Sequence, residues 1–205
     1  MAALKGDTWI KQLGANGGIT PFVPECVKEV TENGVARKVI SYGTGSSEYC
    51  LRLSPNDFRV MTMPKDDEGQ HYIDPKKPDP KYYVPVELQF EEGSGSFFML
   101  PAFSYGLGVA VERLDIPSNI TVLCLGKSTY ARAGVICNVT PGEPGWRGHL
   151  TLEFMNAGPL PCRFYVPEGI IRLAFIESDE PEEAYNRKYQ DQPEMVVLGK
   201  MELGI

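Results

Sequence analysis

A single carboxylate, Glu153, lies in the middle of the segment HLTLEFMN at residues 149–156, among residues of high β-propensity. If this segment is a β-strand, Glu153 projects from the face shared with Thr151 and Met155, and the opposite face carries Leu150, Leu152 and Phe154. Burial raises the pKa of a carboxylate and costs free energy unless the group is paired, so a glutamate in mid-strand is a candidate general base. The strand alone leaves two alternatives open, a solvated outer face and a buried ion pair.

A second group of reactive side chains lies at residues 126–132, which read GKSTYAR. Ser128 and Arg132 are four positions apart, so they would share one face of a short helix. Lys127, Ser128 and Thr129 follow a glycine at the expected start of that helix, where backbone N–H groups and positive charge suit a phosphate or a developing oxyanion. The spacing of a P-loop is absent, and an ordinary capped helix with a surface arginine is the alternative.

A third group is the polar run AYNRKYQDQ at residues 184–192. Its functional interpretation is a lid in which Tyr185, Lys188 and Gln192 close over a triphosphate. The alternative is a solvated tail.

The zinc deaminase signature, H-x-E followed by P-C-x-x-C, is missing from the chain. The histidines are His71 and His149, and no C-x-x-C occurs. Deamination of a base by this chain would therefore need a carboxylate that activates water directly. Glu153 has the right placement, with Ser128 and backbone groups stabilising the tetrahedral centre.

The elements that must position these residues are short strands, because apolar runs are repeatedly broken by Gly, Pro, Asn and Asp. The pattern predicts strands over residues 38–42, 49–53, 58–63, 83–90, 96–100, 107–114, 119–125, 135–139, 149–156, 163–166 and 170–177. Asp7 is expected to cap a helix through about residue 13, and residues 127–133 to form roughly two helical turns. Residues 63–81 are expected to be an excursion with polyproline character rather than a domain linker.

The composition fits one globular domain spanning residues 1–205, with 1–18 as a helical cover and 180–205 as a lid or tail. The 21 Gly and 17 Pro indicate many turns rather than long helices.

A net charge of −7 disfavours binding to a nucleic acid polymer but leaves a small anionic ligand possible. No apolar run of about 18 residues and no signal peptide occur, so a cytoplasmic protein without a membrane segment is expected. Five dispersed cysteines indicate reduced thiols.

Together, the three segments resemble the dCTP deaminase family of the dUTPase-like superfamily. The family pattern runs G-[KR]-S-[ST]-x-A-R, then P-x-W-x-G-x-[LV]-T-L-E-x-x-N, then Y...K-Y-x-x-Q, and this chain matches its order and spacing. Similarity extends to DTWI at residues 7–10, ITPF at 19–22, VISYGT at 39–44 and FIESDE at 175–180, so it covers most of the chain.

The resemblance implies a mainly β fold, a distorted antiparallel β-barrel or jelly-roll of dUTPase type with a few short helices. It also implies a homotrimer with active sites between subunits, in a bacterial cytoplasm or a phage-infected cell. The substrate would be a deoxynucleoside triphosphate whose phosphates hold Mg, with no zinc. The family's general base falls on Glu153, and Ser128 and Arg132 complete the catalytic set. Nucleotide-binding positions fall on Lys127, Ser128, Thr129, Arg132, Glu143, Thr151, Leu152, Glu153, Tyr185, Lys188 and Gln192, with Arg172 near the base pocket.

Three positions depart from the family pattern. Cys50 replaces an aspartate of Y-x-Y-D-[IV]-R, and we expect this to disturb a structural contact more than the chemistry. Arg172 stands at a glutamine position, where a charged fork in place of an amide would alter the substrate. Pro193 follows the last glutamine, where relatives usually have glycine, and would stiffen or redirect the lid.

Three functions are compatible with the sequence. The first is zinc-independent hydrolytic deamination of dCTP, or of a modified deoxycytidine triphosphate, to dUTP or its analogue and ammonia. The second is a dUTPase-like pyrophosphatase or a bifunctional enzyme, in which Glu143 or Glu153 would orient water at the α-phosphate. The run EPGWRG resembles the D-x-D-[YF]-R-G motif of dUTPases, but Gly145 replaces its second carboxylate, which favours deamination. The third is a non-catalytic nucleotide-binding trimer.

Overall fold

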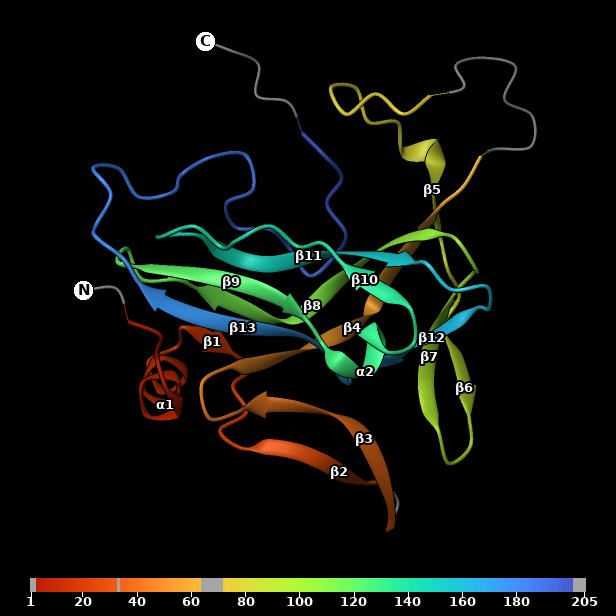
Figure 1. The fold of residues 1–205 in the computed structure, drawn as a ribbon, viewed down its shortest axis with the longest axis horizontal. Coiled ribbons are helices and arrows are strands. Elements are labelled where there is room, and N and C mark those ends of the chain that lie inside the picture. The colour runs from red at the N-terminus through yellow and green to blue at the C-terminus, as the bar shows by residue number, and fades with distance from the viewer. Residues whose placement is uncertain (1–2, 33, 64–71, 201–205) are drawn as a thin grey trace.

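The computed structural model describes residues 3–32, 34–63 and 72–200, and its architecture is mainly β with a few short helices (Figure 1). In chain order the elements are α1 (Asp7–Ala15), β1 (Ile19–Thr20), β2 (Cys26–Glu32), β3 (Val35–Thr44), β4 (Tyr49–Met61), the 3-10 helix η1 (Pro80–Tyr82), β5 (Tyr83–Pro85), β6 (Gln89–Glu91), β7 (Gly95–Leu100), β8 (Tyr105–Asp115), β9 (Ile120–Gly126), α2 (Ser128–Ala131), β10 (Val135–Cys137), β11 (Arg147–Asn156), β12 (Cys162–Val166) and β13 (Gly169–Glu177). The mainly β prediction is confirmed.

Within the described ranges, the strands form one sheet of ten strands and one of three. The larger sheet runs β10–β11–β8–β4–β13–β9, with β1, β2, β3 and β5 attached to it, and the smaller one runs β12–β7–β6. Every described ladder between these strands is antiparallel, and an isolated bridge between Gly148 and Gln192 is parallel. β9 and β10 are the two ends of the main order and share no ladder in the described part of the chain, so hydrogen bonds do not close the expected barrel.

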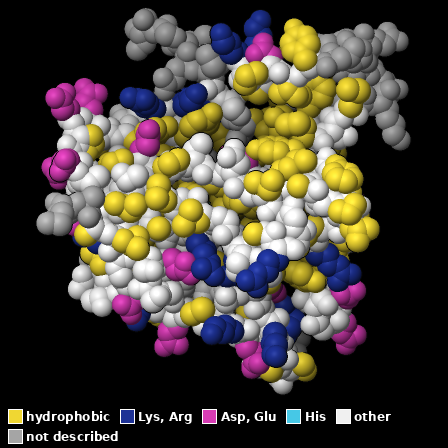
Figure 2. All heavy atoms as spheres, viewed as in Figure 1, with side chains coloured by type: hydrophobic (Ala, Val, Ile, Leu, Met, Phe, Trp, Pro, Cys, Tyr) yellow, Lys and Arg dark blue, Asp and Glu magenta, His cyan; other side chains and the backbone are white. Residues whose placement is uncertain are grey.

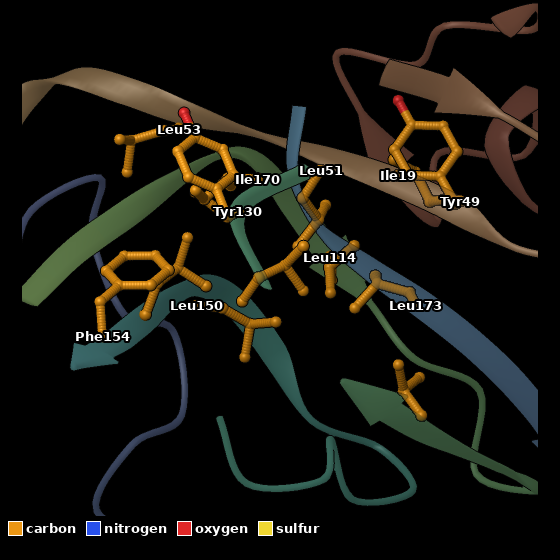
Figure 3. Close-up of a cluster of buried hydrophobic side chains, with 14 of the residues drawn as sticks. Ile19, Tyr49, Leu51, Leu53, Leu114, Tyr130, Leu150, Phe154, Ile170 and Leu173 are labelled. Atoms are coloured by element: carbon orange, nitrogen blue, oxygen red, sulfur yellow. The ribbon is translucent and has the colours of Figure 1, made fainter. Parts of the chain in front are cut away.

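The core forms where the apolar faces of β4, β8, β11 and β13 meet. Leu150 and Phe154 project from β11 into the same cluster as Leu53 of β4 and Ile170 of β13 (Figure 3). Phe154 is 1% exposed, and burial of each such side chain stabilises the fold by about 1.5–3 kcal/mol. The alternation predicted for β11 is confirmed, which fixes Glu153 on the face away from this cluster.

Several element boundaries differ from the sequence-based expectations. The strands expected at residues 49–53 and 58–63 are one strand, β4, with a register irregularity between Leu53 and Phe58. The strand expected at 83–90 is two short strands, β5 and β6. The hairpin partner β2 was not predicted, because its exposed, polar sequence shows little apolar alternation. Part of the 63–81 excursion, residues 64–71, lies outside the described residues.

Both helices also differ from expectation at their ends. Asp7 does not cap α1: Gly6 is the N-cap residue, and the Asp7 carboxylate instead accepts a hydrogen bond from Nζ of Lys11, 3.2 Å away. α2 spans four residues rather than two turns, with Lys127 as its N-cap residue and Arg132 at its C-cap. Ser128 and Arg132 are still one helical turn apart, because the Arg132 N–H donates to the Ser128 carbonyl at 3.1 Å. In the described residues, no helix has the length and apolar character needed to cross a bilayer.

Candidate active site

A cavity of about 710 Å³ lies over the face of β11 that carries Glu153. Its walls come from β5, β8 and β11, from the loop before β11, and from the segment after β13. The lining residues are Tyr83, Tyr105, Leu107, Val139, Thr140, Pro141, Gly142, Glu143, Trp146, Leu150, Thr151, Glu153, Tyr185, Arg187, Lys188, Tyr189, Gln192, Val197, Leu198 and Gly199. Six of the residues predicted for the site, Glu143, Thr151, Glu153, Tyr185, Lys188 and Gln192, therefore meet within one chain.

Glu153 is held in mid-sheet between two neighbouring strands. It lies opposite Leu107 of β8, and its carbonyl accepts a hydrogen bond from the N–H of Asn138 at 3.1 Å. Its Oε2 atom is buried and has no hydrogen-bond partner among the described residues. Glu153 as a whole is half-buried, and no ion pair to it occurs among the described residues, so the buried ion pair left open by the sequence is not seen in this part of the chain. A buried carboxylate oxygen without a partner is costly, and such groups cluster at functional sites.

The surroundings of Glu153 favour its neutral form. Burial raises the pKa of Glu153 to about 7, and a hydrogen bond from its own backbone opposes this rise. The groups that the Glu153 charge influences are Tyr105, Cys124 and Cys137, and burial raises the pKa of each to about 12. These groups are neutral at pH 7 and offer no compensating charge, so the carboxyl group can exchange a proton near neutral pH.

The segment after β13 returns along β11 (Figure 1). Its residues Tyr185 to Gly199 contribute to the lining of the cavity. The His149 N–H donates to the Gln192 carbonyl at 3.0 Å, and the Trp146 indole donates to the Tyr189 carbonyl at 2.9 Å. Gly148 permits this approach: it has φ +136°, and a Cβ atom there would lie 2.6 Å from the backbone nitrogen of Gln192.

Thr151 connects the cavity floor to this segment. Its Oγ1 lies 3.1 Å from Oε1 of Gln192 and accepts a hydrogen bond from the Val197 N–H at 3.1 Å. Nζ of Lys188 donates to the Lys200 carbonyl at 2.6 Å. The segment is therefore packed over the cavity end nearest Thr151, whereas Glu153 lies two residues further along β11.

The remaining residues predicted for the site lie elsewhere in this chain. Ser128, Thr129 and Arg132 are exposed on and beside α2. Thr129 borders a different cavity, of about 740 Å³, together with Ser41 and Glu168. Figure 2 shows basic side chains grouped on the face where α2 lies in Figure 1, with apolar side chains adjacent to them.

Lys127 differs from its helix neighbours because it points inward. It is 4% exposed, and its Nζ atom lies 3.1 Å from Oγ of Ser41 and 3.6 Å from Sγ of Cys50. Burial raises the pKa of the Cys50 thiol to about 11, against the opposing effect of the Lys127 charge. The aspartate found in the family pattern at position 50 would place a carboxylate beside this ammonium group.

Leu152 and Arg172 also lie outside the cavity. The Leu152 side chain is fully buried in the core, as the alternation of β11 requires. Arg172 lies opposite Cys50 across β13 and β4, and its guanidinium donates to the Glu48 carboxylate at 3.0 Å. The guanidinium is thus engaged within the chain rather than directed at the Glu153 cavity.

Sequence reasoning missed Tyr83, Tyr105 and Leu107, which line the cavity beside Glu153. Leu107 was assigned only to a strand, and the two tyrosines begin strands that are distant from β11 in the sequence. Their proximity arises from strand pairing. No local pattern in a single sequence reports which strands become neighbours.

This mainly β protein shares its fold with a solved deaminase structure. It matches the crystal structure of 2'-deoxycytidine 5'-triphosphate deaminase from Agrobacterium tumefaciens with a TM-score of 0.54 and 13% identity, over 86% of this chain and 49% of that one. At that identity the match shows a shared fold. The family model described as dCTP deaminase-like matches residues 9–178, so the chain belongs to the dCTP deaminase-like family.

Two relatives support this assignment along nearly the whole chain. The dCTP deaminase of Dechloromonas aromatica is 42% identical over 203 residues, covering 97% of this chain and 99% of the relative. That of Neisseria gonorrhoeae is 41% identical over 195 residues, covering 93% of this chain and 95% of the relative. The family resemblance inferred from the sequence is confirmed.

Proposed function

We propose that the protein hydrolyses dCTP to dUTP and ammonia, with Glu153 as the general base. The observation that carries this function is Glu153 itself: the residue lines a cavity large enough for a nucleotide, and its buried Oε2 atom has no partner in the described residues. Family membership and the named relatives support the choice of substrate.

In the proposed reaction, Glu153 takes a proton from a water molecule, whose oxygen attacks the ring carbon that bears the amino group. Glu153 then delivers the proton to the adjacent ring nitrogen. The bond to the amino nitrogen breaks, and ammonia leaves with the second proton of the water molecule. A carboxyl group with a pKa of about 7 suits both transfers, because it accepts and returns a proton near neutral pH.

We further propose that a second copy of the chain supplies Ser128 and Arg132 to each Glu153 cavity, within a homotrimer. Three observations support this arrangement. Ser128 and Arg132 are exposed in one chain, and no cationic group of the described residues contributes to the raised pKa of Glu153. The neighbouring Leu125 and Ile136 are also unusually exposed, at 50% and 57%, as expected for an interface.

Mg would enter with the substrate triphosphate. The described residues contain no group of three or more His, Cys, Asp or Glu side chains arranged to hold a metal ion. The polar segment over the cavity, with Tyr185, Lys188 and Gln192, would act as the lid over the phosphates.

The pyrophosphatase alternative has less structural support. Gly145, at the position of the second carboxylate in the hydrolytic motif, has φ +81°, and a Cβ atom there would lie 2.8 Å from Cβ of Ala184. The turn therefore disfavours any side chain at this position.

Incubation of the protein with Mg and a panel of deoxynucleoside triphosphates, with ammonia and pyrophosphate followed separately, tests the function. Ammonia release from dCTP is expected, and Glu153→Gln should lower its rate by more than about a hundredfold. Glu177→Gln, which changes a half-buried glutamate at the end of β13 that is ion-paired with Lys5 and lies outside the cavity, is the matched control and should retain the rate. Pyrophosphate without ammonia would refute the proposal in favour of phosphate hydrolysis, and nucleotide binding without turnover would indicate a non-catalytic protein.

Mixing two inactive variants tests the shared site. Glu153→Gln and Arg132→Ala chains, dissociated and reassembled together, should regain about a quarter of the native rate if each site draws on two chains. No recovery in mixed trimers would place both residues in one chain's site.

A further inference from the structure

Along β11, the cavity extends from Glu153 toward two tyrosines, Tyr83 and Tyr105. Thr151, which contacts the covering segment, and Met155 flank Glu153 on the same face of β11. Met155 lies opposite Tyr105 of β8, and Glu153 lies opposite Leu107. Tyr105 is thus the diagonal cross-strand neighbour of Glu153, a position from which an aromatic side chain reaches its partner.

Tyr83 extends this aromatic end of the cavity. Arg59 of β4 lies opposite Leu107, and Met61 of β4 lies opposite Tyr83 of β5. Tyr83 and Tyr105 both line the Glu153 cavity, and Tyr83 contributes to the raised pKa of Tyr105. Burial raises the pKa of both phenols, so neither carries charge near neutral pH.

We infer that Tyr105 is a positioning residue that acts through Glu153: its ring closes the cavity on the Met155 side of Glu153 and excludes water from the Glu153 carboxyl group. This inference rests on the proposed role of Glu153 as the base. It explains how the carboxyl group stays desolvated beside a large cavity, since β11 alone leaves the Glu153 face open.

Charges on the other groups around Glu153 do not explain its raised pKa. Cys124 of β9 and Cys137 of β10 are neutral thiols at pH 7, because burial raises the pKa of each. The charged residues that line the cavity are Glu143, Arg187 and Lys188, and none contributes to the pKa of Glu153. Desolvation is the leading cause of the raised pKa, and Tyr105 is the largest described side chain diagonal to the carboxyl group.

Replacement of the ring should let water in and lower the pKa of Glu153. In Tyr105→Ala, the acid limb of the kcat/KM profile for ammonia release should move down by about one pH unit. The kcat above pH 8 should fall severalfold, because a less basic carboxylate is a weaker general base, and KM should change less. Tyr105→Phe keeps the ring and should keep the wild-type limb, whereas Tyr42→Ala, which removes a half-buried tyrosine outside the cavity, should not move it.

A direct titration separates this inference from the proposed reaction. Carbon-13 NMR of glutamate-labelled protein, with the Glu153 signal assigned by its loss in Glu153→Gln, should show the same downward shift in Tyr105→Ala without any turnover. If Tyr105→Ala fails to fold, Tyr105→Leu should show a smaller shift in the same direction. An unchanged Glu153 titration in the folded variant, or an equal shift in Tyr105→Phe, overturns the inference. Failure of the wild-type protein to release ammonia refutes the proposed function instead and leaves the titration interpretable.

Discussion

Glu153 of β11 and Leu107 of β8 lie directly opposite each other across the sheet, on the face that borders the large cavity. The cross-strand neighbour of the carboxyl group is therefore apolar, and it cannot form an ion pair with the carboxylate. The absence of an ion pair lowers the free energy of unfolding when Glu153 is ionised, and this loss can be measured.

Glu153→Gln should stabilise the fold at high pH. Burial raises the folded-state pKa to about 7 from an ordinary value of 4.5, so the native state holds its proton more tightly than the unfolded chain. Stability therefore falls as pH rises from about 4.5 to 7, and the full penalty, roughly 3 kcal/mol, applies above that range. The amide variant removes this penalty, so its advantage in denaturant unfolding at fixed protein concentration should be largest at pH 8 and nearly absent at pH 4.5. Glu177→Gln should gain nothing at pH 8, and an equal gain in both variants would contradict the prediction.

The rate of deamination should follow the same ionisation. If Glu153 acts as a base, kcat/KM should fall about tenfold per pH unit below pH 7 and reach a plateau above it. Ammonia release measured from pH 5 to 9, with Mg saturating so that the triphosphate stays ionised, provides the profile. A limb centred near pH 4.5 would show that a solvated carboxylate, and not the buried Glu153, limits the reaction.

Thr151→Val should loosen the segment over the cavity. The exchange removes the Oγ1 atom that accepts the Val197 N–H and contacts Gln192. Loss of one such hydrogen bond, about 1 kcal/mol, should speed amide hydrogen exchange of Val197 roughly fivefold while β11 stays protected. Thr121→Val, on the half-buried face of β9, is the matched control. Unchanged exchange at Val197 would mean that Thr151 does not hold the segment.

Cys50→Asp should stabilise the protein at neutral pH. A carboxylate at this position would face the buried ammonium of Lys127, which now has Ser41 and a weakly accepting thiol as partners. A charge-assisted hydrogen bond there is worth about 1.5–3 kcal/mol. Because such pairing lowers the folded pKa of the new Asp, the gain should be present at pH 7 and lost as pH falls below about 4. Cys50→Asn provides the uncharged comparison, and equal stability of the two variants at pH 7 would show that the desolvation cost cancels the pairing.

Local patterns were sufficient for much of the fold. Alternation in β11 fixed the orientation of Glu153, because strand geometry sends successive side chains to opposite faces in any β-sheet. Where the alternation of apolar and polar residues is weaker, the predicted strand boundaries were less accurate. The exposed strand β2 lacks an apolar face, and β4 continues through a bulge that reads in the sequence as a gap between two strands. Asp7 lies one residue too late to cap α1. The residue at which a helix starts depends on backbone contacts with distant segments, such as the hydrogen bond from the Asp7 N–H to the Ser46 carbonyl.

The sequence by itself determined the family, the mainly β class and the face of β11 from which Glu153 projects, since motif order and strand alternation are local properties. The tertiary structure decided which side chains surround that carboxylate. It brought Tyr83, Tyr105 and Leu107 to Glu153, buried Lys127 against Cys50, and turned Arg172 toward Glu48. Strand pairing and burial depend on contacts between segments far apart in the chain, and these contacts set the desolvation that gives a carboxyl group its pKa.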